Sequence, residues 1–452
     1  MRLTIIHPAI GHKPGEKYIG TWQMEPLPAA VVAGLTPRDV ALNFFDDRME
    51  TIPFDAPTDL VAISVETYTA KRAYQIASEY RRRRVPVVMG GFHAMLCPEE
   101  VADYAEAVVV GEAEEIWPHV LDDAAHGTLR KFYRSQGRPS LANLKPNRAI
   151  FRGKRYLPIG LVEAGRGCHF RCDFCAIQTA FGRTQTRRPT DDILAELSGL
   201  AGSGKRFFFF VDDNITSNMQ QAKELYTALA PLKLRWVSQA SINAAHDEEF
   251  LTLIKASGCE GLLIGFESLN PDNLRNMGKG FNTMRGGFEE ALANLRRHGL
   301  KLYLTFIFGY DEDTTESFAE TVEFAKRHEL FIGAFNHLTP FPGTPLYDRL
   351  ANEGRLLYDA WWLDERYRYN MIPFRPLKMT PAELQAGCLA ARRSFYSVGS
   401  ILRRSFNPVN RPDFFMLRNF FLINAMIRAE VAERDFYPLG DPTWRGTLLK
   451  AQ

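Results

Sequence analysis

The chain has 452 residues, of which 46% are hydrophobic and 24% are charged, and its formal net charge is +2. At about 150 residues per domain this length predicts two or three domains, and the composition excludes a disordered, collagen-like or small disulfide-stabilised protein. The balance of 55 Lys and Arg against 53 Asp and Glu gives no reason to expect a nucleic acid as partner.

No segment predicts secretion or a membrane span. The apolar run after Arg2 is too short for a signal peptide. The apolar segment 414–427 contains Arg418 and is shorter than the roughly 20 residues of a spanning helix. We therefore expect a cytoplasmic protein, with peripheral contact to a membrane left open.

Residues 1–135 predict a Rossmann-like domain with a doubly wound parallel sheet, the first part of an α/β fold. Short apolar runs alternate with helical stretches that carry a polar face, which is typical of a parallel sheet buried on both sides. The five predicted strands lie in segments 2–8, 39–47, 59–67, 85–91 and 105–115.

Candidate ligand-binding residues lie in the loops after three of these strands, because open parallel sheets bind ligands at the carboxyl ends of their strands. The Gly90-Gly91 pair would let a large ligand approach the backbone, although a tight turn explains such a pair equally well. The candidates are Ser64, Thr67, Tyr68, Gly90, Gly91, Phe92, His93, Gly111 and Glu112.

The rest of the chain divides into three further regions. Residues 136–155 are polar, contain proline and predict a linker. Residues 156–345 contain about six β/α units, too few for a complete eight-stranded barrel, and indicate a partial (β/α)6 barrel of the TIM type. Residues 346–452 are helical in pattern, rich in arginine and aromatic residues, and predict a C-terminal region that closes the barrel.

The clearest chemical signal is a group of three cysteines, Cys168, Cys172 and Cys175, with the spacing C-x3-C-x2-C on a loop after a predicted strand. Such crowding indicates a metal or redox site rather than disulfides. Three thiolates can ligate an iron–sulfur cubane and leave one iron open. A structural zinc site that also uses His169 or a distant ligand is the alternative. The other cysteines, which we expect to be isolated buried thiols, are Cys97, Cys259 and Cys388.

This spacing, with a strand before it and β/α units after it, resembles the radical SAM superfamily. The resemblance implies a [4Fe–4S] cluster on the three cysteines, with S-adenosylmethionine on its open iron. Cleavage would give a 5′-deoxyadenosyl radical, with electrons from a flavodoxin- or ferredoxin-like donor. Positions that match the family's contacts with S-adenosylmethionine are Asp212, Asp213, Asn214, Ser238, Gln239, Glu267, Ser268, Ile307 and Gly309.

The N-terminal region resembles the cobalamin-binding domain of B12-type radical SAM enzymes, on the segments VPVVMGGFHA and AVVVGEAE. The resemblance implies that cobalamin binds the loop residues named above, with Tyr68, Phe92 and His93 beside the corrin. One departure is the absence of D-x-H-x-x-G, because no Asp stands two places before His12. A Rossmann domain without cobalamin is therefore the alternative.

These resemblances imply methyl transfer, dependent on cobalamin, to an unactivated carbon (less often phosphorus) of a small-molecule or lipid-like substrate. Tyr68 and His337 are the candidate catalytic residues, although a scaffold role explains His337 equally well. The alternatives are B12-type radical chemistry without methylation, such as ring formation, oxidation or rearrangement, and a non-enzymatic metal-binding or regulatory module. A nucleic-acid-modifying radical enzyme is disfavoured, because the basic runs 81–84 and 403–404 are short.

Overall fold

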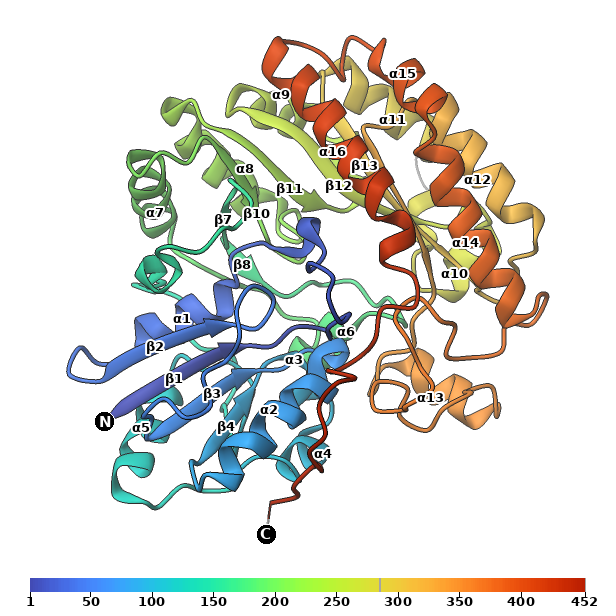
Figure 1. Ribbon diagram of the computed structural model, residues 1–452. Coiled ribbons are helices and arrows are strands. Elements are labelled where there is room, and N and C mark those ends of the chain that lie inside the picture. Colours follow the sequence, from blue (N-terminus) through green and yellow to red (C-terminus); the bar gives the residue numbers. More distant parts are fainter. Residues whose placement is uncertain (284–285, 452) are drawn as a thin grey trace.

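The structure is a computed structural model that describes residues 1–283 and 286–451 (Figure 1). Two six-stranded parallel sheets form its framework, one in the N-terminal part and one in the middle of the chain. The mixed α/β architecture expected from the sequence is therefore confirmed.

The N-terminal sheet has the strand order β2-β1-β3-β4-β5-β6, and all its pairs are parallel. Helix α2 packs on one face, while α1 and α5 pack on the other, so the sheet is doubly wound. The strands are β1 Arg2–His7, β2 Ala41–Asp46, β3 Leu60–Ser64, β4 Val87–Gly90, β5 Ala107–Val110 and β6 Phe132–Arg134. The helices are α1 Leu27–Leu35, α2 Ala70–Arg82, α3 Phe92–Leu96, α4 Pro98–Ala102 and α5 Trp117–His126.

The expectation of five strands in this region was wrong by one. The additional strand, β6, has three residues and pairs only with β5 at the edge of the sheet. A strand this short at an edge buries few side chains, so its sequence lacks the apolar run that marks the other five.

The middle sheet has the order β14-β13-β12-β11-β10-β7, which is the partial six-stranded barrel expected from the sequence. Its strands are β7 Gly160–Val162, β10 Phe207–Phe210, β11 Arg235–Ala240, β12 Cys259–Glu267, β13 Lys301–Phe308 and β14 Ile332–His337. A small antiparallel hairpin, β8 Gly165–Arg166 with β9 Thr186–Arg187, accompanies it. The helices are α6 Ala176–Phe181, α7 Thr190–Gly202, α8 Met219–Leu229, α9 Glu248–Ala256, α10 Pro271–Asn276, α11 Gly287–Arg297 and α12 Glu316–Arg327.

The middle sheet buries only one of its faces completely. Along β11, β13 and β14, residues that face the surrounding helices are buried, and the residues between them are partly or fully exposed. Since side chains alternate between the two faces of a strand, the exposed set lines the inside of the barrel. The inside is therefore an open cleft rather than a filled core. Cleft-facing residues include Phe209, Val237, Gln239, Tyr303, Thr305, Ile307 and Asn336.

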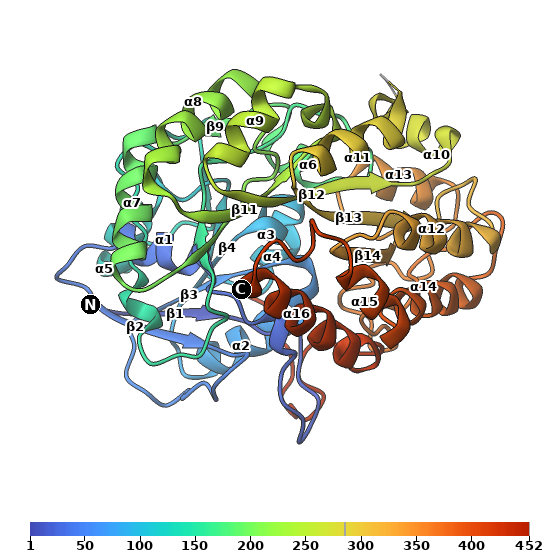
Figure 2. The ribbon, with the colours of Figure 1, turned by 90° about the horizontal axis from the view of Figure 1, so that it is seen from above.

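The C-terminal region consists of α13 Pro345–Asn352, α14 Pro381–Phe395, α15 Val398–Ser405 and α16 Phe414–Glu433. Helix α16 crosses the open side of the barrel opposite α8, α9 and α11 (Figure 2). Its Phe415 packs 6.3 Å from Phe207 of β10, and its Phe420 packs 5.2 Å from Phe331, next to β14. Helix α16 therefore spans the two ends of the sheet at the amino-terminal side of the strands. Within the described residues, no helix is both long and apolar enough to cross a membrane.

Residues 136–155 connect the two sheets and pack against both regions. Leu141 and Leu144 are buried beside Val31 of α1. Arg148 bridges the two regions, because it donates to Glu25 at 2.8 Å and to Glu196 at 2.7 Å. Short 3-10 turns complete the chain: η1 Gly20–Trp22, η2 Thr67–Thr69, η3 Arg148–Phe151, η4 Ala230–Leu232, η5 Ile242–His246 and η6 Gly280–Thr283.

Candidate active site between the two sheets

The cysteine loop begins directly after β8 and is held by residues that follow β10. Gly167 has φ +95°, and a Cβ there would lie 2.1 Å from the carbonyl oxygen of Thr184, so only glycine fits. The Gly167 N–H donates to Asp213 at 2.7 Å. The Asn214 side-chain amide donates to the Cys168 sulfur at 3.6 Å. The loop geometry is therefore set before any ligand binds.

The three thiols of this loop influence one another electrostatically. The pKa of Cys172 is raised to about 12, chiefly by burial and in smaller part by the Cys175 and Cys168 thiols, while Lys279 opposes the shift. Thiolates placed this close need positive charge to be stable, which a cluster of iron ions supplies. The donor set thus fits an iron–sulfur cluster.

The isolated cysteines differ from the expectation at one position. Cys259 and Cys388 are buried, as expected, whereas Cys97 is half-buried. Cys97 stands between the short helices α3 and α4, where neither helix covers it fully.

Two carboxylates after β10 lie in the interior beside the cysteine loop. Burial raises the pKa of Asp212 to about 7, and the hydrogen bond from the Ala164 N–H, 3.0 Å long, partly offsets this. Burial likewise raises the pKa of Asp213 to about 6. Both carboxylates accept hydrogen bonds from backbone N–H groups of the segment that leads to the cysteines, so they position that segment. Among the residues that the structure describes, none is a hydrogen-bond partner of the buried Asp212 Oδ1.

At the end of β12, Glu267 lies beside the cysteine loop. Its φ is +63°, an uncommon value for a non-glycine residue, and the strand's register shifts at this point. Lys279 donates to Glu267 at 2.5 Å, and Thr305 of β13 donates to it at 3.3 Å. Ser268 instead accepts from the Asn270 N–H at 3.1 Å and so begins the turn into α10.

The remaining candidates for S-adenosylmethionine fall into two groups. Gln239 and Ile307 are cleft-facing and partly exposed. Ser238 is fully buried and donates to the Phe210 carbonyl at 3.1 Å, on the side away from the cleft. Gly309 has φ +100°, and a Cβ there would lie 2.4 Å from Leu384 of α14, so this glycine is required by packing.

In the N-terminal sheet, the loop after β4 is shaped by Gly91. Its φ is +97°, and a Cβ would lie 2.8 Å from the Val65 carbonyl oxygen, so the β3 and β4 loops approach each other closely. Ser64, Gly90 and Phe92 are partly exposed there. His93 is fully buried, 3.2 Å from the Thr67 hydroxyl and 3.0 Å from Glu100. His93 and Thr67 therefore stabilise the loops from within.

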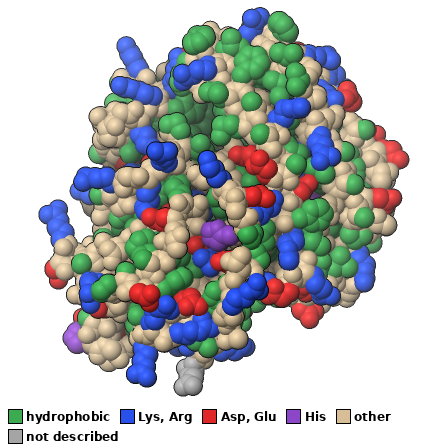
Figure 3. Space-filling model, in the orientation of Figure 1, with side chains coloured by type: hydrophobic (Ala, Val, Ile, Leu, Met, Phe, Trp, Pro, Cys, Tyr) green, Lys and Arg blue, Asp and Glu red, His purple; other side chains and the backbone are tan. Residues whose placement is uncertain are grey.

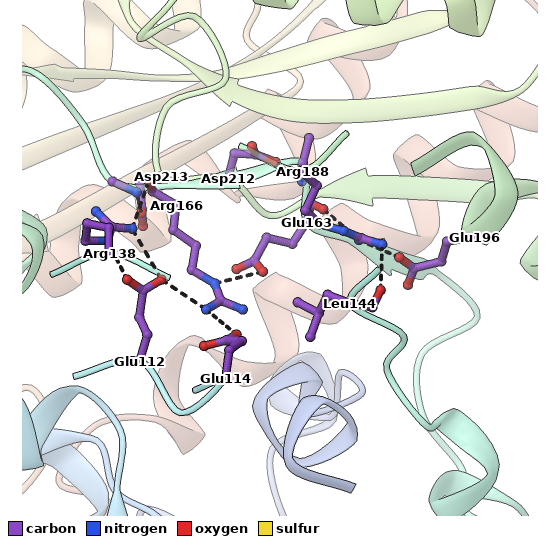
Figure 4. Close-up of polar contacts among 12 residues, drawn as sticks. Glu112, Glu114, Arg138, Leu144, Glu163, Arg166, Arg188, Glu196, Asp212 and Asp213 are labelled. Carbon is purple, nitrogen blue, oxygen red and sulfur yellow. Dashed lines mark hydrogen bonds and ion pairs between the residues drawn. The ribbon is translucent and has the colours of Figure 1, made fainter. Parts of the chain in front are cut away.

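Glu112, which follows Gly111 after β5, takes part in an ion-pair network that joins the two sheets (Figure 4). It pairs with Arg138 and, at 3.1 Å, with Arg166 of β8. Arg166 also pairs with Glu114 at 2.6 Å and with Glu163 at 2.9 Å. Because Arg166 stands two residues before Cys168, this network connects the N-terminal domain directly to the cysteine loop. Gly111 itself has φ +112°, and a Cβ would lie 2.0 Å from the Ser135 hydroxyl oxygen.

Tyr68 lies where the N-terminal domain, the barrel and the C-terminal region meet. Its hydroxyl is 3.4 Å from that of Thr339, which follows β14. Its ring packs 4.9 Å from Trp361 and 5.1 Å from Tyr369, and lies edge-on to Phe341. Burial raises the pKa of Tyr68, so its hydroxyl is protonated at neutral pH. These four rings form an aromatic wall, of which only Trp361 is fully buried.

His337 shares with Phe335 the face of β14 that packs against α14, where Phe335 contacts Phe395 at 5.3 Å. Burial lowers the pKa of His337 to about 3, and its Nε2 atom has no hydrogen-bond partner in the described part of the chain. The exposed Asn336 occupies the cleft-facing position at this strand end. The structure thus brings Tyr68 to the cleft and places His337 behind it.

Sequence reasoning missed Glu66, which lies between two residues that it selected. Glu66 follows β3, and its side chain is accessible to solvent, yet the protein around it desolvates the carboxyl. Burial raises its pKa to about 7, and no cation is paired with it within the described residues. An acidic residue in a loop after a strand was the available signal.

The carboxyl ends of the two sheets face each other across this cleft. After β3, Tyr68 contacts Thr339 and Phe341 beyond β14. After β4, Phe92 packs 5.5 Å from Phe181 of α6, the helix that follows Cys175. After β5, Glu112 pairs with Arg166. The loops at the carboxyl ends of both sheets therefore surround one shared space.

Comparison with known proteins agrees with this geometry. The family model "Radical SAM superfamily" matches residues 162–325, and "Radical SAM proteins, N-terminal" matches residues 48–145. The chain is 31% identical over 389 residues to Bacteriochlorophyllide d C-12(1)-methyltransferase of Chlorobaculum tepidum, with 84% of each chain covered.

Two solved structures share the fold over 95% of this chain. One is the radical S-adenosylmethionine methyltransferase TsrM of Kitasatospora setae, with cobalamin and a [4Fe-4S] cluster bound (TM-score 0.65, 17% identity, 99% of that chain). The other is the cobalamin-dependent S-adenosylmethionine radical enzyme OxsB (TM-score 0.68, 13% identity, 71% of that chain). The fold match includes both sheets.

Proposed function

The chain belongs to the radical SAM superfamily, and we propose that it is a cobalamin-dependent member that methylates an unactivated carbon of a hydrophobic small molecule. The observation that carries the proposal is the shared cleft, in which the Rossmann loops face the cysteine loop. The similarity to a methyltransferase over 84% of both chains supports the same reaction type.

The radical SAM part of the site is formed by the barrel. Cys168, Cys172 and Cys175 would hold the [4Fe–4S] cluster, whose chemistry is the one-electron cleavage of S-adenosylmethionine. Asp213 fixes the start of the cysteine loop through Gly167. Gln239 and Ile307 face the cleft beside this loop and are the residues that we assign to contacts with S-adenosylmethionine.

The N-terminal loops would hold cobalamin, which supplies a transferable methyl group when it is bound. Gly90 and Gly91 are partly exposed between Ser64 and Phe92, and these four residues form the surface that we assign to cobalamin. Glu112 and His93 support this surface from behind through the ion pairs and hydrogen bonds described above. This assignment divides the predicted cobalamin residues into contacting and supporting groups.

The aromatic wall indicates an apolar substrate. Tyr68, Phe341 and Tyr369 are partly exposed, and aromatic rings bind flat or aliphatic groups well. A wall of this kind also excludes water, which matters because a carbon radical is quenched by stray hydrogen donors. We assign Tyr68 to contact with the substrate and His337 to support of the β14 end.

Glu66 is the acidic group of the cleft. With a pKa raised to about 7 by burial, its carboxyl can hold or release a proton near neutral pH. It lies in the loop that carries Tyr68, so it would face the substrate or the corrin amides.

The test follows the methyl group and needs no knowledge of the substrate. Anaerobically reconstituted protein, supplied with cobalamin, dithionite and S-adenosylmethionine labelled in its methyl group, is expected to release 5′-deoxyadenosine and to transfer label to the corrinoid. Release of 5′-deoxyadenosine without label transfer would support B12-type chemistry without methylation. Absence of both products would support a non-enzymatic module and contradict the proposal.

A further inference from the structure

The outer face of the C-terminal helices α15 and α16 exposes an unusual amount of apolar surface. Of the ten large hydrophobic side chains that are exposed among the described residues, seven lie between positions 398 and 426. The most exposed are Phe414 at 79% and Phe406 at 68%. Contiguous apolar surface of this kind marks a site of interaction rather than ordinary surface variation.

These side chains form two stripes, one on α15 and one on α16. On α15 and the residue after it, Val398, Leu402 and Phe406 recur every four residues and share one face. On α16, the exposed stripe contains Phe414, Phe421, Leu422 and Met426. The buried faces of the two helices are joined by a 3.0 Å hydrogen bond from Arg404 to Asn424. The two stripes therefore lie on neighbouring helices.

The charges around the stripes are almost all positive. Between residues 384 and 429 the sequence has seven arginines and a single acidic residue, Asp413. That one carboxylate is neutralised by Arg235, which pairs with it at 2.7 Å. Exposed arginines stand among the apolar side chains, and Figure 3 shows hydrophobic and basic side chains together over the upper part of this face. The exposed arginines are Arg393, Arg403, Arg411, Arg418 and Arg428.

A basic pocket continues this surface toward the barrel. A cavity of about 270 Å³ at the amino ends of β11 and β12 has three cations, Lys233, Arg235 and Lys255, and one carboxylate, Glu260, in its lining. It adjoins the start of α16 through the Arg235–Asp413 pair. Apolar side chains rimmed by cations of one sign match a layer of anionic headgroups above a hydrocarbon interior. A second copy of the chain would instead place arginines against arginines.

We propose that the α15–α16 face docks the protein on the surface of a membrane that contains anionic lipids. Phe406, Phe414 and Phe421 would enter the headgroup region, and the arginines would contact lipid phosphates. Helix α16 crosses the barrel at the amino ends of the strands, whereas the candidate active site lies at the carboxyl ends. Docking would therefore leave the cleft unobstructed.

The test measures flotation of the full-length protein with vesicles, which needs no cofactor. Binding is expected to vesicles of phosphatidylcholine with phosphatidylglycerol, to weaken in high salt, and to be weak with phosphatidylcholine alone. The variants Leu402→Glu/Phe406→Glu and Arg403→Glu/Arg418→Glu each alter one component of the face. Each should weaken binding by more than about tenfold. Matched controls are Leu377→Glu, which is 62% exposed elsewhere, and Arg155→Glu.

Either of two results would overturn the proposal. One is equal flotation of the wild type and both face variants, since all these positions are exposed and the variants should fold. The other is a wild type that ignores anionic vesicles but dimerises, with both face variants monomeric, because the face would then be a contact between copies of the chain. Unchanged far-ultraviolet circular dichroism verifies that each variant is folded.

Discussion

The two parallel sheets of this protein have the same number of strands but bury their faces differently. In the N-terminal sheet, the middle of β1 and nearly all of β3 and β5 are buried without interruption. In the barrel sheet, β10, β11 and β14 alternate between buried and partly exposed residues. The first sheet is covered by helices on both faces, whereas the second leaves one face to the cleft.

This difference in burial determines which residues each sheet can offer to a ligand. A strand buried on both faces can offer ligands only its carboxyl end, so the N-terminal domain contributes loops. A strand with one open face can offer side chains along its length, as Gln239, Tyr303 and Thr305 do. The N-terminal domain thus contributes loops at one side of the cleft, and the barrel strands line the space in which the substrate would lie.

Two neighbouring residues of β10 test the difference in burial between the two faces of the barrel sheet. Phe208 is fully buried against the helices, while Phe209 faces the cleft and is partly exposed. Phe208→Ala should lower the free energy of unfolding by about 4 kcal/mol, because it leaves a cavity in the core. Phe209→Ala should lower it by less than about 2 kcal/mol. Denaturant unfolding measures both, and equal losses would mean that the cleft face is packed like the core.

A second prediction concerns the connection between the two sheets. Arg166→Met leaves Glu112, Glu114 and Glu163 without their shared cation and should cost about 3 kcal/mol of stability. Limited proteolysis should also cut more readily between the two regions. The matched control is Arg134→Met, whose partner Glu99 is exposed, and which should cost less than about 0.5 kcal/mol. Similar losses in both variants would show that the network is not what joins the sheets.

The smallest effect is expected at Glu66 and depends on pH. Burial raises its pKa from 4.5 to about 7, so the folded protein holds this proton more tightly than the unfolded chain does. The charge of Glu66 therefore destabilises the fold progressively as the pH rises from about 4.5 to 7. Glu66→Gln should flatten that part of the profile of melting temperature against pH. The exposed Glu433→Gln is the control, and an unchanged profile in Glu66→Gln would place Glu66 outside the cleft.

The sequence predicts the fold better than the position of individual site residues. Apolar runs and turn residues locate the strands β1 to β5, β7 and β10 to β14, and the cysteine spacing locates the cluster loop. The edge strand β6 lacks that signal. Burial of neighbouring elements, not local pattern, decides which residues near a strand end reach the cleft.

His337 and Glu112 illustrate the limit. Both follow or end a strand at the correct edge, and both were reasonable candidates for contact with a ligand. The structure turns His337 toward α14 and surrounds Glu112 with Arg138 and Arg166. Asn336 and His337 are neighbours on one strand, so their side chains lie on opposite faces of the sheet. Which of the two faces the cleft is known only when the helix that covers the other face is known.

The proposed function requires one cleft that is shared by an iron–sulfur site from the barrel and a corrinoid site from the N-terminal domain. The most direct measurement compares wild type with the variant in which Cys168, Cys172 and Cys175 are all alanine, each reconstituted anaerobically with iron, sulfide and cobalamin. We predict that the variant loses iron, sulfide and 5′-deoxyadenosine production but keeps the corrinoid absorption of the wild type. A variant that still produces 5′-deoxyadenosine, or a wild type that binds no corrinoid, would contradict the account.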